Sequence, residues 1–145
     1  MKKLILFILL LVIGFIAWYG YHEFSRRNKD LKSAQAAMIV DAPSLITAFE
    51  KDSSSANKKY TDKVIAVTGN VKKIDKDGNP VIIFLGPEGQ MSSVKCSMDS
   101  THAADYNTIK PGTNVKIKGR CTGGQTEDLF GTDVTLNYCV IEGNK

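Results

Sequence analysis

Apolar and polar positions alternate most clearly along Lys63–Ile74, KVIAVTGNVKKI, where β-branched residues dominate. This pattern predicts a strand, and twelve residues is long for one. Gly69 lies near its middle, and a glycine inside a long strand favours a bulge or a sharp bend. A long, bent first strand can serve both halves of a small sheet, so the pattern indicates a small closed barrel.

Four further segments have strand patterns and are separated by turn-forming or short helical stretches. They are Val81–Leu85, Met91–Met98, Thr113–Thr122 and Thr132–Ile141, with a short helix expected within 99–109. A helix over 43–59 precedes them, because Asp41 can cap it and Pro43 suits its first turn. A helix between the third and fourth of five strands predicts an OB-fold, a mostly β, five-stranded Greek-key barrel, over residues 41–145.

Residues 4–21 form an uncharged, strongly apolar run, LILFILLLVIGFIAWYGY, preceded by Lys2 and Lys3. Its length is at the lower limit for a transmembrane helix, and its aromatic end suits a membrane interface. We expect residues 1–24 to be an uncleaved signal-anchor that gives a single-pass membrane protein; a cleaved signal peptide is the alternative. The export-like start places the following domain outside the cytoplasm, and residues 25–40 are expected to form a polar helical stalk.

The formal charge of +4 is not evenly spread along the sequence. The basic excess lies within residues 1–40, whereas basic and acidic residues balance over residues 41–145. A basic flank beside an apolar run suits anionic head groups. The neutral balance of the domain weakens a nucleic-acid-binding hypothesis.

One basic patch is nevertheless predicted, because the first and fourth strands of such a barrel pair. Its residues are Lys72, Lys73, Lys116, Lys118 and Arg120. The alternative is that these side chains form a solvated outer face that keeps the domain soluble. Phe84 and Tyr138 lie in apolar strand patterns, so both are expected in the core, and no aromatic platform for stacking bases is predicted.

The three cysteines, Cys96, Cys121 and Cys139, match no zinc-binding spacing. They are expected either to be buried apolar residues or, if the domain is exported, to include one disulfide, with Cys121–Cys139 as the candidate pair. The sequence also lacks a phosphate-binding loop, a nucleophile elbow and a histidine–carboxylate set. We therefore expect neither an enzyme nor a bound cofactor or metal.

Several segments resemble the tRNA anticodon-binding-like OB-fold family. They are Ala48–Asp52, Tyr60–Val71, Val94–Cys96, Pro111–Gly123 and Asp133–Ile141. The resemblance spans about residues 45–141 and implies the OB-fold and its extent. The family's name suggests nucleic-acid binding, and its members are commonly small exported or membrane-tethered bacterial proteins. The resemblance carries over no catalytic residue.

The sequence thus predicts a membrane-anchored binding or interaction module of the bacterial cell envelope. The membrane would be contacted through residues 4–21. A protein, peptide or small ligand would meet the loops Gly86–Gln90 and Gly123–Gly131, since rigid barrels carry function on loops. The alternative function is weak single-stranded nucleic-acid binding through the predicted basic patch.

Overall fold

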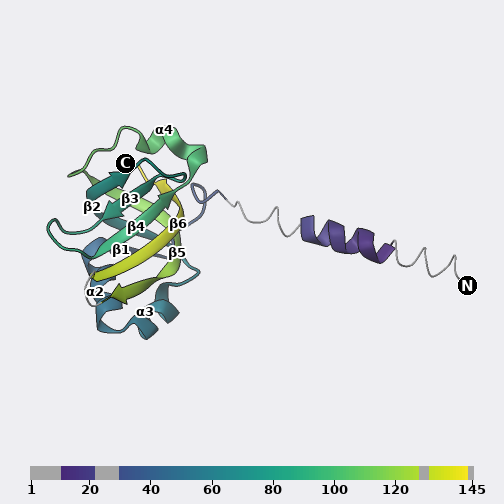
Figure 1. Ribbon diagram of the computed structural model, residues 1–145, viewed down its shortest axis with the longest axis horizontal. Helices are drawn as coiled ribbons and strands as arrows, with labels where there is room; N and C mark the ends of the chain where they lie inside the picture. The colour runs from purple at the N-terminus through teal and green to yellow at the C-terminus, as the bar shows by residue number, and fades with distance from the viewer. Residues whose placement is uncertain (1–10, 22–29, 128–130, 144–145) are drawn as a thin grey trace, which may run out of the picture. The chain divides into compact units, whose positions relative to one another are not determined.

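The computed structural model describes residues 11–21, 30–127 and 131–143 of the chain (Figure 1). The chain divides into two compact units, Met1–Asp30 and Leu31–Lys145. In the first unit, residues 11–21 are helical. None of the helices in the described ranges is both long and apolar enough to cross a membrane. The predicted span begins at residue 4, and residues 4–10 lie outside the described residues, so the anchor stays a prediction.

The second unit is mostly β. Its elements are β1 (Met38–Asp41), α2 (Ala42–Lys51), α3 (Ser53–Tyr60), β2 (Val64–Asp75), β3 (Ile82–Leu85), β4 (Ser93–Met98), the 3₁₀ turn η1 (Ser100–His102), α4 (Ala103–Tyr106), β5 (Asn114–Glu127) and β6 (Gly131–Ile141). The predicted order of a helix followed by five barrel strands, with a short helix after the third, is confirmed.

Strands β2 to β6 form a closed barrel. Their order is β2-β3-β4-β6-β5, and β5 pairs back onto β2. All these neighbours are antiparallel except β4 and β6, which are parallel. In Figure 1 the helix α4 lies at one end of the barrel, and α2 and α3 lie at the other.

The irregularity in the pairing of the long strand β2 is not at Gly69. Gly69 pairs regularly with Val115, and the register shift lies between Val71 and Lys73. A Cβ atom at Gly69 would lie 2.9 Å from the Cβ atom of Ala42, at the start of α2. The glycine therefore allows α2 to pack closely on the strand, and the prediction of a bulge at this residue is wrong.

The leading helix is split by a second capping residue. Asp41 caps α2 by accepting a hydrogen bond of 3.0 Å from the Ser44 amide. Asp52 ends α2 and caps α3 in the same way through the Ser55 amide, also at 3.0 Å. The hydrogen bond from the Ser44 amide lowers the pKa of the Asp41 carboxyl group. The pKa of Asp52 is lowered first by a hydrogen bond from the Ser55 hydroxyl and then by that from the Ser55 amide. The predicted helix over 43–59 is thus two helices, because an aspartate inside the pattern competes for the backbone.

The described part of the predicted helical stalk, residues 30–40, is not helical. Residues 31–37 form turns and an extended segment, which we call the strap, and its Leu31 side chain is buried. The Ala37 amide donates to the Val64 carbonyl at 2.7 Å. The chain then continues as β1, which pairs in parallel with the edge of β2 beside the barrel. A free strand edge has unpaired backbone groups, and these outweigh the helical preference of the segment.

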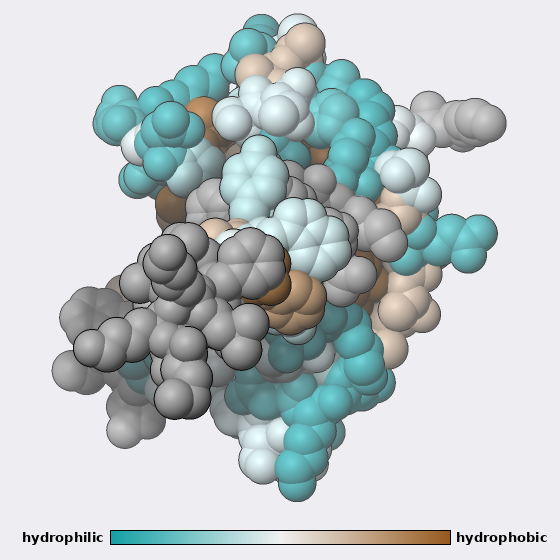
Figure 2. All heavy atoms as spheres, turned by 90° about the vertical axis from the view of Figure 1, so that its right-hand side faces the viewer, coloured by the Kyte–Doolittle hydropathy of each residue, from teal (hydrophilic) through white to brown (hydrophobic). Residues whose placement is uncertain are grey.

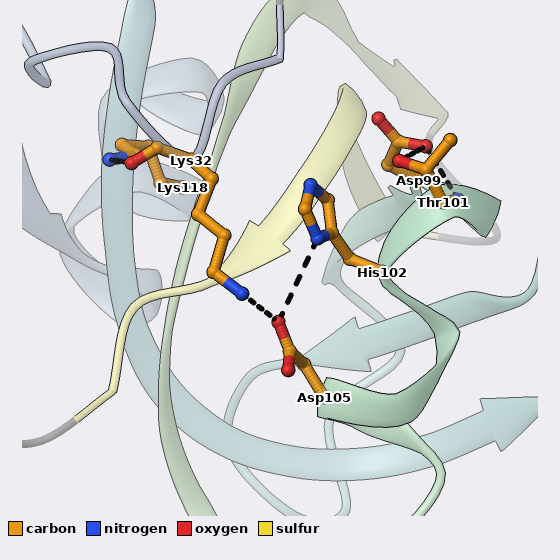
Figure 3. Close-up of polar contacts among 6 residues, drawn as sticks. All are labelled: Lys32, Asp99, Thr101, His102, Asp105 and Lys118. Carbon is orange, nitrogen blue, oxygen red and sulfur yellow. Dashed lines mark hydrogen bonds and ion pairs between the residues drawn. The ribbon is translucent and has the colours of Figure 1, made fainter.

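Lys118 of β5 fixes the strap to the barrel (Figure 3). Its side chain is 5% exposed, and its Nζ atom donates to the carbonyl oxygens of Lys32 at 3.2 Å and Ala34 at 2.7 Å. The Lys32 ammonium in turn lies 2.7 Å from Asp105 of α4. The strap is therefore held by a buried cation and by a surface ion pair.

The core of the second unit lies inside the barrel and under α2. Its largest fully buried side chains include Leu45, Phe49, Ile65, Ile83, Leu85, Met98, Ile117 and Leu136. On the side of this unit that Figure 2 shows, hydrophilic residues cover much of the surface.

Candidate ligand-binding face

The five residues of the predicted basic patch do not form one exposed patch, because several of them are engaged in separate interactions. Lys118 is buried against the strap, as described above. Lys116 forms an ion pair with Glu142 at 2.8 Å, and Lys118 lies 3.7 Å from the same carboxylate. The hydrogen bond from Lys116 is the main cause that lowers the pKa of Glu142, followed by the two lysine charges. Both lysines thus stabilise the fold, while Arg120 is exposed on β5.

Lys72 and Lys73 lie at the register shift of β2, where the strand pairs with β3 instead of β5. The Lys72 ammonium donates to the backbone carbonyls of Gln90 at 2.5 Å and Ser92 at 3.0 Å. Lys73 is exposed, and its Nζ atom lies 6.0 Å from the centroid of the Phe84 ring. This distance is at the limit for a cation–π interaction.

Phe84 is at the centre of a row of side chains across three strands. Lys73 of β2 pairs with Phe84 of β3, and Phe84 pairs with Lys95 of β4. Directly paired residues point to the same face of a sheet, so the three side chains share the outer face of the barrel. Phe84 is half-buried there. The prediction that Phe84 belongs to the core is therefore wrong.

A groove of about 460 Å³ runs along this row, and we call it the aromatic groove. It is lined by Lys72, Lys73, Phe84, Met91, Ser93, Lys95 and Asp133. Met91 is 71% exposed, so the groove has an apolar wall open to solvent. The groove combines an aromatic ring, a thioether side chain and three ammonium groups.

A second, larger groove of about 710 Å³ lies on the β5–β6 side of the same face, and we call it the polar groove. It is lined by Asn57, Lys95, Thr122, Gly123, Gly124, Gln125, Glu127, Gly131, Asp133 and Thr135. Its volume is within the range of small-molecule sites. Gly123 and Gly131 have φ angles of +112° and +81°, which favour glycine.

The two grooves share the Lys95–Asp133 ion pair. The Lys95 ammonium lies 2.6 Å from Asp133 Oδ2, and the Ser93 hydroxyl donates to Asp133 Oδ1 at 2.8 Å. The ion pair is about one-third exposed on both sides. A ligand that covers it contacts both grooves.

Sequence reasoning missed Phe84 and Lys95 as candidate binding residues. The signal was the alternation within strand β3. Ile83 and Leu85 are buried, so Ile82 and Phe84, which alternate with them, face outward. The continuous apolar run had suggested burial on both faces. Tyr138, which was also expected in the core, is 44% exposed beside the irregular register of β5 and β6.

The two predicted contact loops differ in outcome. Residues 86–90 form the expected turn between β3 and β4. The segment 123–131 is mostly strand, because β5 continues to Glu127 and β6 begins at Gly131; residues 128–130 lie outside the described residues. Parts of this segment line the polar groove.

The three cysteines are free and buried in the structure. Burial raises the pKa of Cys139 well above its ordinary value, and its contact with the Cys96 thiol adds to the shift. The Cys121–Cys139 disulfide stays a prediction. Across residues 11–21, 30–127 and 131–143, no group of three or more His, Cys, Asp or Glu residues could hold a metal ion.

Comparison with solved structures finds chains that are similar to this one. A "putative nucleic acid-binding lipoprotein" from Klebsiella pneumoniae is similar with a TM-score of 0.56 and 16% identity, over 74% of this chain and 93% of that one. A "putative aspartyl-tRNA synthetase" from Leishmania major gives a TM-score of 0.45 and 7% identity, over 79% of this chain and 22% of that one. The first similarity supports the fold alone.

Comparison with sequences gives one family. No curated protein matches the chain. The tRNA_anti-like family matches residues 1–139. Because this match covers nearly the whole sequence, the chain belongs to the tRNA_anti-like family.

Proposed function

We propose that this protein binds single-stranded nucleic acid on the outer face of β2, β3 and β4, and that residues 4–21 hold it at a membrane. One observation carries the proposal of the ligand: the half-buried Phe84 ring lies between Lys73 and Lys95 on one face of the sheet. Proteins that bind single strands combine rings that stack on bases with cations that contact phosphates.

In this proposal each side chain of the row has a separate role. The Phe84 ring offers a face on which one base can stack. Lys73 and Lys95 flank it across neighbouring strands. The Lys73 ammonium can reach a phosphate beside that base, whereas the Lys95 ammonium must share its charge between a phosphate and Asp133. Lys72 is already bonded to two carbonyl oxygens, so its role is to fix the 90–92 segment at the rim of the aromatic groove. A site with one ring, the exposed Lys73 and a second lysine already paired with Asp133 predicts weak, salt-sensitive binding.

The family and one solved structure also support the proposal. The family takes its name from a tRNA anticodon-binding type of domain, and the Klebsiella protein is described as nucleic acid-binding. That protein is also described as a lipoprotein, which is consistent with attachment to a membrane.

The membrane part of the proposal rests on the uncharged run over residues 4–21 and the lysines before it. We place the domain outside the cytoplasm, so its ligand would be nucleic acid outside the cytoplasm. Reporter fusions after Lys145 test this placement. Activity of a reporter that works only inside the cytoplasm would refute it.

Binding is tested by fluorescence anisotropy with the full chain in a mild nonionic detergent. The probe is a labelled single strand of mixed sequence and about twelve nucleotides, within the site sizes of OB-folds. Phe84→Ala should weaken binding by about 5- to 150-fold, which is the range measured for loss of one base-stacking contact. Phe84→Tyr retains the ring and should bind nearly as the wild type does.

Two lysine variants give the matched comparison. Lys73→Ala should weaken binding and reduce its salt dependence by the contribution of one phosphate contact. Lys110→Ala removes an exposed lysine that lines neither groove and should change little. Absence of binding at about 50 mM salt, where phosphate contacts are strong, would refute the proposed ligand and favour a protein, peptide or small ligand. Equal effects of Lys73→Ala and Lys110→Ala would refute the proposed face.

A further inference from the structure

The polar groove differs in charge from the aromatic groove beside it. Among the described residues that line it, Lys95 is the one cation, whereas Glu127 and Asp133 are both carboxylates. Because Lys95 lies 2.6 Å from Asp133, its charge is locally neutralised. The remaining lining groups are the amides of Asn57 and Gln125, threonine hydroxyls and glycine backbone.

A phosphate group is therefore a poor occupant of the polar groove. It would lie near the Glu127 carboxylate, and close like charges repel each other. The groove suits groups that donate hydrogen bonds instead. A single strand bound across Lys95 and Asp133 must then keep its phosphates on the side of the aromatic groove and turn the edge of a neighbouring base into the polar groove.

The acceptor capacity of the two carboxylates supports this orientation. Each ionised carboxylate oxygen can accept two hydrogen bonds. Ser93 engages one oxygen of Asp133 and Lys95 the other, so the carboxylate retains positions for further donors. Glu127 is exposed, and among the described residues no hydrogen bond or ion pair engages its carboxylate. A Cβ atom at Gly123 would lie 2.8 Å from Asn57 Oδ1, so the glycine allows the Asn57 amide to lie close to β5 at the edge of the groove.

We propose that the polar groove selects bases that carry an exocyclic amino group, namely cytosine, adenine and guanine, over uracil and thymine. Glu127 and Asp133 accept hydrogen bonds from that amino group, as acidic side chains do from cytosine N4. This inference rests on the proposed function and deepens it, since it assigns a base preference to the same face. Uracil presents a carbonyl oxygen at the corresponding position, and that oxygen would face a carboxylate without a hydrogen atom between them.

The test compares deoxycytidine and deoxyuridine strands of about twelve nucleotides, binding to the full chain in detergent at neutral pH. The two bases have the same ring size and differ at one exocyclic position, so stacking and phosphate contacts are closely matched. The cytidine strand should bind about tenfold more tightly, within the range for one well-formed polar contact to a base.

The variants separate base selection from a general electrostatic effect. Glu127→Ala removes a negative charge and should raise the affinity for both strands, but it should bring the cytidine-to-uridine ratio towards one. Glu88→Ala removes the same charge from the turn between β3 and β4, outside the lining of the polar groove, and should leave the ratio unchanged. The readout is the ratio of the two affinities, which a uniform change of charge does not alter.

The outcomes distinguish the two proposals. Equal binding of the two strands, or a ratio that Glu127→Ala leaves unchanged, would overturn base selection while the proposed function stands. If neither these strands nor the mixed-sequence strand binds, the proposed function fails, and the inference fails with it.

Discussion

Replacement of Lys118 by methionine is the sharpest test of how the strap is held. The buried ammonium donates to the carbonyl oxygens of Lys32 and Ala34 at 3.2 and 2.7 Å, and it lies 3.7 Å from Glu142. Methionine retains most of the length of the side chain and fills most of its space. It supplies no donor, so both carbonyl oxygens lose their partner.

The magnitude follows from the two hydrogen bonds. Each hydrogen bond from a charged donor contributes about 1.5–3 kcal/mol to stability, and burial of the ammonium offsets part of that gain. The cost of burying the ammonium is smaller than the contribution of the two hydrogen bonds together. We therefore expect Lys118→Met to lower the free energy of unfolding by about 2–4 kcal/mol. For a unit of this size, that loss corresponds to a melting temperature lower by roughly 8–16 °C.

Guanidinium denaturation of the full chain in detergent, followed by circular dichroism, measures this loss. The matched control is Lys116→Met, which removes a partly exposed ion pair with Glu142 and should cost less than about 1 kcal/mol. Suppose that Lys118→Met is no less stable than Lys116→Met. Water would then satisfy the carbonyl oxygens of Lys32 and Ala34 as well as the Lys118 ammonium does. The account of the strap as a fixed part of the fold would then be wrong.

Three further changes test other parts of the structure. Gly124→Ala should destabilise the protein by about 1–3 kcal/mol in thermal melts, because its Cβ atom would lie 2.6 Å from the Phe49 ring; a neutral result would show that the ring can move away. Ser92→Ala should cost about 1–3 kcal/mol by the same measurement, since the Ser92 hydroxyl accepts the buried Thr132 amide at 3.0 Å, and stability equal to wild type would contradict this role. Acid titration tests Glu142: its pKa is lowered in the folded state, so its contribution is present above the unfolded value near 4.5 and is lost as the pH falls through the folded value. Glu142→Gln should therefore be less stable than wild type near neutral pH and lose less stability below about pH 4.5, and parallel curves would contradict the ion pairing.

The fold of the barrel could be predicted because its signals are local. Strand alternation, turn residues and the capping position of Asp41 each depend on neighbours in sequence, and together they gave the correct order of helices and barrel strands. Strand β1 could not be predicted in this way. Residues 38–41 are a strand because they meet the edge of β2 at residues 65–68, and no pattern within four residues reveals a distant edge.

The candidate binding face was harder to predict, because it depends on pairing between strands. Lys73, Phe84 and Lys95 are far apart in sequence and become neighbours only through the register of β2, β3 and β4. The predicted patch assumed instead that lysines on paired strands remain available. Lys118 shows why that assumption fails: the strap, whose structure was not foreseen, covers it.

The same point explains why a neutral domain can still present a binding face for an anion. The balance of charges over residues 41–145 counts every ion pair as well as every available charge. Two basic side chains, Lys116 and Lys118, lie beside Glu142, so they contribute little to the field at the surface. Lys73 lies across the sheet from them, exposed and next to an aromatic ring. Binding of a polyanion depends on the charges within about one Debye length of the site, about 8–10 Å at moderate salt. The local arrangement around Phe84, not the total for the domain, therefore decides whether this face can attract a nucleic-acid strand.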